Sequence, residues 1–256
     1  MRFFVSLSFK GQSYCGWQVQ QNANSVQAEL EKALSLAIGE PINVVGAGRT
    51  DTGVNAINYI AHFNTSNNIS KDPELLLYKI NAILPLDISI NNIFFVADDA
   101  HARFDATSRT YKYFINNIKD PFATFSYYFR YPINMDTMNK ASKLFLGNKD
   151  FSSLEKVNGG NKTSICTVYE AYWRKTDENH FVFTVTANRF LRNMVRAMVG
   201  TLLEVGKGKK DPEWILEILE AKNRSLAGQS VPGNALFLTE IKYPYPLTNQ
   251  LIKKLK

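Results

Sequence analysis

Two short apolar runs of β-type residues, 42–45 and 57–63, enclose the stretch that most constrains this chain. Between them stands Gly46-Ala47-Gly48-Arg49-Thr50-Asp51-Thr52-Gly53-Val54-Asn55-Ala56, which holds three glycines, an arginine and an aspartate. Glycine and aspartate dominate tight turns, so the pattern predicts two strands joined by a short connection. We expect this connection to present the carboxylate of Asp51 beside the cation of Arg49, exposed in a cleft at the end of a strand.

This glycine-rich stretch does not fit the two familiar nucleotide-binding motifs. After Gly46-x-Gly48 a dinucleotide fingerprint needs a small residue where Asp51 stands, and a phosphate-binding loop needs Gly-Lys-Ser/Thr, which is missing. Two interpretations stay open from the residues alone. The stretch is either a loop that carries chemistry or an ordinary hairpin turn with a solvated ion pair.

Composition favours a globular protein with a polyanionic partner. The 256 residues are 45% hydrophobic, enough for the core of one large domain or of two halves. A formal charge of +7 and an isoelectric point near 9.2 favour nucleic acid as the partner, although many basic proteins bind none. Cys15 and Cys166 are too few for a disulfide scaffold or a cysteine-based zinc site. With no signal peptide pattern and no run of about 18 apolar residues, we expect a cytoplasmic protein without membrane contact.

Hydrophobic periodicity predicts more strands than helices. The first expected helix covers residues 24–38 and can be capped by Asn24, and the second covers 72–84 with Pro73 in its first turn. Two more are expected over 135–146 and 189–205, and another follows Asp211-Pro212-Glu213. The expected strands cover 3–9, 42–45, 57–63, 88–96, 109–116, 164–174, 180–187 and 236–241. With strands in the majority and several joined by short turns, the chain is expected to be α+β, with helices on a largely antiparallel sheet.

The helix expected over 189–205 carries three arginines on an otherwise apolar surface. Arg189, Arg192 and Arg196 fall at i, i+3 and i+7, on one stripe of that helix. A solvated face would usually mix acidic with basic residues, so this stripe favours contact with phosphate or a carboxylate. Because an unpaired buried guanidinium is very costly, we expect one of the three to meet a carboxylate.

The run His101–Tyr113 interleaves basic and aromatic residues at high density. Rings in such a run can stack on bases while cations such as Arg109 hold phosphates, as in the recognition of RNA with splayed nucleotides. The alternative is a strand that turns Tyr111 and Tyr113 toward the core, which can hold for one of them. The histidines of the chain are scattered, and we expect each to be structural.

The aspartate loop, Gly-Arg-Thr-Asp-x-Gly-Val with Ala56 beyond it, resembles the catalytic loop of the TruA tRNA pseudouridine synthases. Six further stretches resemble motifs of this family and occur in the family's order. They are Gly16-Trp17-Gln18, Val26-Gln27, Asn81-Ala82-x-Leu84-Pro85, the run from His101 to Tyr113, Asn193-Met194-Val195-Arg196 with Val199-Gly200-Thr201-Leu202, and Ala227-Gly228. Because these matches span nearly the whole chain, the chain is identified as a member of this family.

The resemblance implies two α/β halves related by pseudo-twofold symmetry, residues 1–104 with the catalytic loop and residues 105–256. Their sheets would join into one central, largely antiparallel sheet with a basic cleft. It also implies a homodimer, without cofactor or metal, that isomerises uridine to pseudouridine in the tRNA anticodon stem-loop, at positions 38–40 on its 3′ side. A carboxylate can hold the base or the sugar while the uracil turns, without redox chemistry.

The resemblance also assigns roles to single residues. Asp51 is expected to be the catalytic nucleophile, and Tyr111 is expected to stack on the flipped uracil. Arg196 is expected beside the catalytic loop, where pairing would keep the Asp51 carboxylate ionised and aimed. Four more arginines are expected to bind the substrate: Arg49, Arg109, Arg189 and Arg192.

Four places depart from the family's usual residues. Asn55 stands where histidine is usual, Tyr59 where glutamine is common, Gly11-Gln12 where an Asp-Gly pair is common, and Lys149 where histidine is often found. None removes a catalytic group. Since such positions could line the RNA surface, the departures put in doubt how closely RNA selection follows the family.

Three other functions compete with the family's. A zinc-dependent base deaminase is excluded because the Pro-Cys-x-x-Cys element is absent. A non-catalytic RNA-binding module would explain the charge and the aromatic residues but gives the Asp51 loop no purpose, and a turnover assay separates it. An aspartate-dependent phosphotransferase would use Asp51 with magnesium, although no second acidic residue stands close by in the loop, and activity in EDTA separates it.

We expect Arg196→Ala to lower mainly the single-turnover rate, and Arg189→Ala and Arg192→Ala to weaken tRNA binding and flatten its salt dependence. The reason is that a cation beside a nucleophile acts on the reaction, whereas cations on phosphates act on affinity. Single-turnover kinetics and binding titrations at several salt concentrations measure the two effects separately. An Arg196→Ala enzyme with a normal single-turnover rate would refute this division of roles.

Overall fold

The computed structural model describes residues 1–69, 72–157, 160 and 162–248, which form two compact units. Met1–Thr107 and 238–248 belong to the first unit, and Ser108–Phe237 forms the second. The break near residue 107 lies close to the one expected after residue 104. The last strand, however, groups with the first unit instead of the second. That the halves 1–104 and 105–256 are related by pseudo-twofold symmetry stays a prediction.

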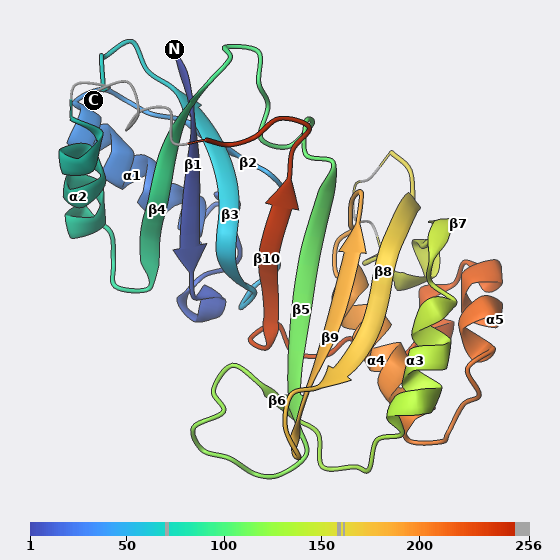
Figure 1. Ribbon diagram of the computed structural model, residues 1–256. Helices are drawn as coiled ribbons and strands as arrows, with labels where there is room; N and C mark the ends of the chain where they lie inside the picture. Colours follow the sequence, from blue (N-terminus) through green and yellow to red (C-terminus); the bar gives the residue numbers. More distant parts are fainter. Residues whose placement is uncertain (70–71, 158–159, 161, 249–256) are drawn as a thin grey trace. The chain divides into compact units, whose positions relative to one another are not determined.

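The first unit is built on a sheet with the strand order β4 (Ile88–Val96), β1 (Arg2–Phe9), β3 (Asn55–Asn64) and β10 (Leu236–Lys242). β1 runs antiparallel to both β3 and β4 (Figure 1). The short strand β2 (Val44–Gly46) pairs antiparallel with β3, so that Gly46 lies opposite Ala61. β1 supplies much of the core, because its apolar side chains are buried along almost its whole length.

Two helices, α1 (Val26–Ile38) and α2 (Pro73–Ile83), pack against each other, and α2 also packs against β4 (Figure 1). The cap of α1 is Ser25, whose hydroxyl accepts a hydrogen bond from the Ala28 amide at 3.3 Å, and not the expected Asn24. α2 starts at a proline, as expected, and its first turn is capped by the Asp72 carboxylate.

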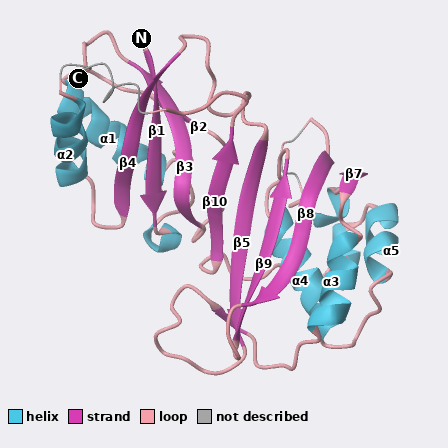
Figure 2. Cartoon of the chain, viewed as in Figure 1, coloured by secondary structure: helices cyan, strands magenta, loops and turns pink. Residues whose placement is uncertain are grey.

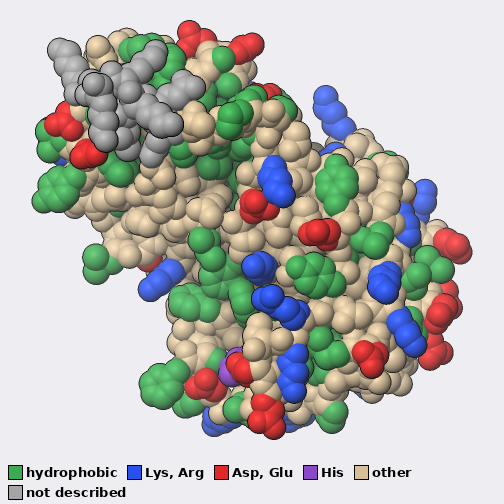
Figure 3. Space-filling view, viewed as in Figure 1, with side chains coloured by type: hydrophobic (Ala, Val, Ile, Leu, Met, Phe, Trp, Pro, Cys, Tyr) green, Lys and Arg blue, Asp and Glu red, His purple; other side chains and the backbone are tan. Residues whose placement is uncertain are grey.

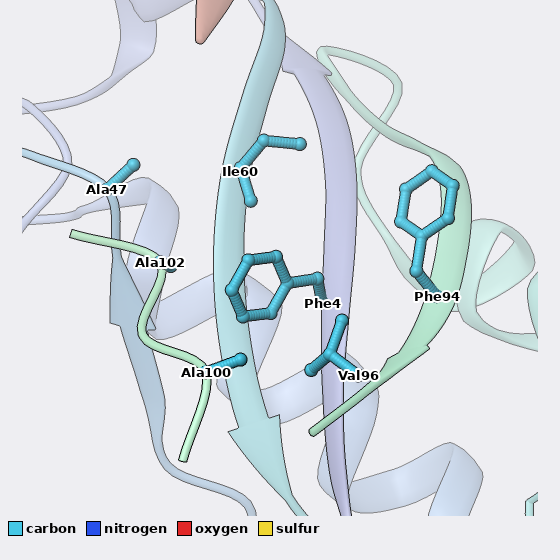
Figure 4. Close-up of a cluster of buried hydrophobic side chains, with 7 residues drawn as sticks. All are labelled: Phe4, Ala47, Ile60, Phe94, Val96, Ala100 and Ala102. Atoms are coloured by element: carbon cyan, nitrogen blue, oxygen red, sulfur yellow. The ribbon is translucent and has the colours of Figure 1, made fainter. Parts of the chain in front are cut away.

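A cluster of buried apolar side chains ties the β2–β3 connection to the rest of the first unit. Ala47, at the start of that connection, and Ala102, in the turn after β4, both belong to it (Figure 4). The other members are Phe4, Ile60, Phe94, Val96 and Ala100. Tyr243 and Tyr245, which follow β10, pack against the same cluster. The start of the aspartate loop and the 100–102 segment are therefore fixed to one core.

The second unit contains a sheet with the order β5 (Ser108–Asn116), β9 (His180–Ala187), β8 (Ile165–Lys175) and β7 (Gly147–Asp150), each pair antiparallel. β6 (Tyr127–Tyr128) pairs parallel with the end of β5. Three helices accompany this sheet, and α3 packs on both β8 and α4 (Figure 2). They are α3 (Met135–Lys143), α4 (Met194–Gly206) and α5 (Trp214–Ala221). The predicted α+β class with largely antiparallel strands is confirmed.

Short 3₁₀ turns interrupt the loops of both units, at Gly11–Ser13, Ser152–Leu154 and Arg224–Leu226. Within the described ranges, the chain has no helix that is long and apolar enough to cross a lipid bilayer.

The prediction of one helix over 189–205 was wrong at its start. α4 begins at Met194, because the backbone at Asn193 adopts the left-handed conformation with a φ of 67°. Asparagine tolerates this conformation better than most residues, and a helix cannot continue through it. Phe190 and Leu191 continue the apolar spacing of the helix, but they lie in the connection that precedes it.

The helix expected over 135–146 was correct at its start but ends three residues early, at Lys143.

α4 is buried almost all round, and it meets the segment 227–229 through backbone atoms. A Cβ on Gly200 would overlap the carbonyl oxygen of Gln229, and a Cβ on Gly228 would lie 2.7 Å from the Gly200 carbonyl carbon. The Thr201 hydroxyl accepts a hydrogen bond from the Gly228 amide at 3.0 Å. This close approach explains why small residues are needed at both positions.

Gly200→Ala should therefore destabilise the protein, although an alanine in the middle of a helix is usually about 0.5–1 kcal/mol more stable than a glycine. Overpacking of this kind costs about 1–3 kcal/mol or more, because two backbone segments must separate. Thermal and urea unfolding measure the effect. Gly48→Ala is the matched control, since its Cβ would meet no atom within 4 Å. Equal stability of the two variants would contradict the packing argument.

Candidate active site

The aspartate loop is the connection of the β2–β3 hairpin, as the sequence predicted. The amide of Ala47 donates a hydrogen bond to the Ile60 carbonyl at 2.9 Å, which closes the base of the loop. The Val54 amide donates to the Asp51 carbonyl at 3.2 Å, which makes a tight turn at the acidic residue. Asp51 is half-buried and Arg49 is exposed. Asp51 thus lies within the loop, several residues beyond the end of β2, and not at the strand end that we expected.

Tyr59, one of the departures from the family pattern, bonds to the backbone of this loop. Its buried hydroxyl donates a hydrogen bond to the Gly48 carbonyl and accepts one from the Gly48 amide at 3.3 Å. Its ring stacks on the buried ring of Trp17 with the centroids 4.2 Å apart. A Cβ on Gly46 would lie 2.5 Å from Nε1 of Trp17, so this position must be glycine for the two rings to fit.

A second contact fastens the far end of the loop. The Asn55 side-chain oxygen accepts a hydrogen bond from the Gly11 amide at 2.9 Å, and Asn55 is buried. The Trp17 amide donates to the Thr50 carbonyl at 3.4 Å. The backbone amides of Gly11 and Trp17 therefore bond to the Asp51 loop at Asn55 and Thr50, on either side of Asp51 in the sequence.

The interpretation of Asn55 and Tyr59 as RNA-lining positions was wrong. Their side chains are 1% and 0% exposed and bond to the protein's own backbone. Lys149 is half-buried, and its ammonium donates a hydrogen bond to the Leu144 carbonyl at 2.5 Å. These supporting roles could not be predicted from the sequence, because the residue type of a polar side chain does not show whether the side chain is buried against the backbone or exposed to solvent.

In the second unit, Tyr111 and two of the expected arginines come together around one turn. The ring of Tyr111 on β5 meets Phe190 edge to face, with the centroids 5.1 Å apart. Arg109, two residues earlier, donates from Nη1 to the Asn188 carbonyl at 2.8 Å. The amide of Arg189 donates to the Asn188 side chain at 2.8 Å. This arrangement groups Arg109, Tyr111 and Arg189 at the end of β9.

The two tyrosines of the strand differ in burial, in line with the prediction that one faces the core. Tyr113 is 0% exposed and donates its hydroxyl to the Pro232 carbonyl at 2.9 Å, whereas Tyr111 is half-buried. Burial raises the pKa of the Tyr113 hydroxyl well above its usual range. Tyr113 is thus part of the core, and Tyr111 keeps an exposed part.

The predicted stripe of three arginines on one helix was wrong, because only Arg196 lies on α4. Arg189 and Arg192 belong to the connection that precedes the helix, where the exposed Arg192 accepts a hydrogen bond from the Lys156 amide at its carbonyl. Nε of Arg196 donates to the Val231 carbonyl at 2.7 Å, and the Val231 amide donates back to the Arg196 carbonyl at 3.2 Å. The three arginines do recur at i, i+3 and i+7 in the sequence. They do not share a helical face, because the helix starts only after Asn193.

Arg224 is a further arginine of the second unit that sequence reasoning did not find. Its Nη2 donates to the Ser230 hydroxyl at 2.8 Å, and that hydroxyl also accepts from Nδ2 of Asn193 at 2.6 Å. Burial lowers the pKa of Arg224 from its ordinary value. The only sequence signal was its closeness to the Ala227-Gly228 motif. Ser230 thereby connects Arg224 to Asn193, the residue just before α4.

Several lysine and arginine side chains lie over the strands of the second unit on the face drawn in Figure 3.

Within the described residues, no three His, Cys, Asp or Glu side chains are grouped in a way that would hold a metal ion. His62 is buried, which lowers its pKa to about 4, and His180 pairs with Asp177 at 2.8 Å.

Comparison with known proteins decides the family. The tRNA pseudouridine synthase A of Bacteroides fragilis is 46% identical to this chain over 244 residues, which make up 95% of this chain and 96% of the relative. The chain belongs to the tRNA pseudouridine synthase family. The family's sequence pattern matches residues 141–244, which include the Tyr111-facing Phe190, α4 and the Gly228 contact.

Relatives in other genera support the same assignment. The tRNA pseudouridine synthase A of Parabacteroides distasonis is 45% identical, covering 96% of this chain and 97% of the relative. That of Clostridium acetobutylicum is 41% identical, covering 93% of this chain and 98% of the relative. Both alignments include nearly the whole chain, and so both units and the Asp51 loop belong to the shared part.

We predict that Tyr59→Phe slows catalysis while leaving tRNA affinity nearly unchanged. The ring would keep its stack on Trp17, but Gly48 would lose both hydrogen bonds to the hydroxyl and the loop would shift. Small misplacements of a reacting group cost about 10- to 100-fold in rate. Single-turnover kinetics and equilibrium binding measure the two quantities.

Tyr14→Phe is the control for this experiment. It removes another buried hydroxyl of the first unit, which donates to the Asp87 carboxylate at 2.6 Å. The two variants should lose similar stability, about 0.5–1.5 kcal/mol for a hydrogen bond. If Tyr14→Phe slows the reaction as much as Tyr59→Phe does, the effect is general destabilisation and Tyr59 does not position the loop.

Proposed function

We propose that this enzyme isomerises uridine to pseudouridine in tRNA, with Asp51 as the nucleophile. The observation that carries the proposal is the hairpin loop, which contains the half-buried Asp51. The buried Tyr59 bonds to the loop backbone at Gly48, and the buried Asn55 bonds the end of the loop to the Gly11 amide. The near full-length likeness to enzymes named tRNA pseudouridine synthase A supports the reaction and the substrate.

The chemistry requires a group that can bond covalently and then leave. The N1–C1′ glycosidic bond breaks, a C5–C1′ bond forms, N1 takes up a proton and C5 gives one up, so the product is an isomer of the substrate. A carboxylate that adds and departs keeps one fragment attached while the uracil turns. A rigid loop favours this step because the aspartate needs no reorganisation to reach its target.

The remaining expected residues keep the roles that the family resemblance implies. Tyr111, with part of its ring exposed beside Phe190, stacks on the flipped uracil. Arg196 acts on the Asp51 carboxylate. Four arginines contact the RNA backbone: Arg49, Arg109, Arg189 and Arg192.

The finer features of the proposal follow from the family resemblance. The target is a uridine on the 3′ side of the anticodon stem-loop, the enzyme acts as a homodimer, and the reaction takes place in the cytoplasm. The formal charge of +7 supports a polyanionic substrate held largely by its phosphates. Mapping of pseudouridine in treated tRNA transcripts tests the target, and sedimentation tests the dimer.

Asp51→Asn should abolish tritium release from tRNA that carries 5-tritiated uridine, because the amide cannot act as the nucleophile. Binding of the tRNA should stay within about threefold of wild type, since the change removes one charge from a half-buried site. Tritium release in EDTA by the wild type separates this chemistry from magnesium-dependent phosphotransfer. Substantial release by the variant would sink the assignment of Asp51, and no release by the wild type would leave the RNA-binding module as the better function.

A further inference from the structure

The turn 101–105 of the first unit presents a phenylalanine to solvent. The side chain of Phe104 is 76% exposed, and the guanidinium of Arg103 lies 5.9 Å from the centroid of its ring. One face of the ring is covered by His101, whose ring centroid lies 4.2 Å away. A single exposed ring is common on protein surfaces. This one differs because it combines an ordered turn, a neighbouring cation and a second ring against it, which is an arrangement suited to stacking on a nucleobase.

The turn that carries Phe104 is held by side-chain hydrogen bonds at successive amides. The amides of Arg103 and Phe104 donate to Nδ1 of His101 at 3.1 and 3.2 Å. The His101 amide donates to the Asp105 carboxylate at 2.7 Å, and the Ala102 amide donates to Nδ1 of His62 at 3.1 Å. The backbone under Phe104 is therefore fixed before any ligand arrives.

Two tyrosines that follow β10 also form hydrogen bonds to this turn. The hydroxyl of Tyr243 donates to the Ala102 carbonyl at 2.6 Å, and that of Tyr245 donates to the Asp105 carboxylate at 2.7 Å. Burial lowers the pKa of both His62 and His101, which keeps their Nδ1 atoms available as acceptors at neutral pH.

A column of rings joins Phe104 to the core of the first unit. Phe4 stacks on His62 with the centroids 6.1 Å apart, His62 meets His101 edge to face at 4.7 Å, and His101 meets Phe104 at 4.2 Å. The outermost ring is the exposed one. A flat aromatic ligand on Phe104 would extend these ring contacts and would also lie near the Arg103 guanidinium.

This column stands beside the hairpin that carries Asp51. His62 lies on β3 opposite Val45 of β2, and Ala102 shares a buried cluster with Ala47 (Figure 4). Ala47 is the first residue of the aspartate loop. The turn and the loop are thus two extensions of one rigid core.

We infer that the exposed face of Phe104 stacks on a nucleobase of the substrate RNA near the target uridine, while Arg103 contacts an adjoining phosphate. The inference rests on the proposed function for its substrate, and it adds a fixed base-stacking surface to that site. A ring stacks on any base, so this contact holds an unpaired nucleotide in place without reading the sequence. A cation beside it suits the phosphate that follows each base.

Equilibrium binding of an unmodified tRNA transcript tests the inference, in the Asp51→Asn background so that no turnover occurs. Phe104→Ala should raise Kd by about 5- to 100-fold, as for the loss of one stacked base. Because no charge changes, the slope of log K against log salt should stay the same. Arg103→Ala should instead reduce that slope by about one unit. Phe104→Trp should bind as tightly as the wild type, since it keeps a flat ring.

Two controls separate stacking from other effects. Phe122→Ala removes a phenylalanine that is 91% exposed elsewhere on the chain, and it should leave Kd unchanged. The melting temperature of Phe104→Ala should also be unchanged, because the side chain is mostly in solvent. Wild-type affinity in Phe104→Ala, or in Phe104→Leu, which keeps an apolar side chain without a ring, would overturn the inference.

The outcome can be told apart from failure of the proposed function. Tritium release is measured on the Phe104 variants with Asp51 restored. If the otherwise wild-type enzyme releases tritium but Kd does not depend on Phe104, the stacking contact is wrong and the function stands. If Kd depends on Phe104 but no enzyme releases tritium, the contact stands and the function fails.

Discussion

The hydrogen bonds between the buried Tyr59 hydroxyl and the backbone of Gly48 are the interaction on which the Asp51 loop depends. A loop rich in glycine has many accessible conformations, and fixing each residue costs about 1–2 kcal/mol of conformational entropy. One hydroxyl that both donates to and accepts from the same residue restricts that residue strongly. The ring beneath it is held in turn by Trp17. The loop therefore obtains its order from the hydrophobic core and not from its own residues.

The same logic applies on the other side of the hairpin. Asn55 and the Gly11 amide form a pair in which a departure from the family pattern meets another departure, since Gly11-Gln12 and Asn55 both differ from the usual residues. Residue 11 also leaves no room for a side chain, because a Cβ on Gly11 would lie 2.2 Å from the Val54 carbonyl oxygen. The Asn55 hydrogen bond and this close backbone contact therefore hold the end of the loop together.

Sequence reasoning found the elements and the aspartate loop but misjudged what surrounds them. The hairpin followed from glycines between two apolar runs, α1 from its apolar period, and α2 from the proline at its start. The arginine stripe failed because apolar periodicity continued through Phe190 and Leu191, while the backbone turned at Asn193. Whether the Asn55 side chain is exposed or buried depends on its contact with residue 11, 44 positions away. The residues next to Asn55 in the sequence therefore cannot predict its burial. The exposure of Phe104 could not be predicted either, because its turn is held by His62 on β3 and by Tyr245 after β10, both far away in the sequence.

The placement of β10 beside β3 has a consequence for how the chain is made. The first unit contains residues 1–107, yet its sheet includes a strand from residues 236–242, which leave the ribosome long after β1, β3 and β4. Until then, the part of β3 that faces β10 has unpaired backbone groups, an edge that invites wrong pairing. Pairing over so long a separation is slow compared with local contacts. The sheet of the first unit is therefore incomplete, with the β3 edge unpaired, until β10 has been made. The tyrosines that bond to the Phe104 turn are made after β10.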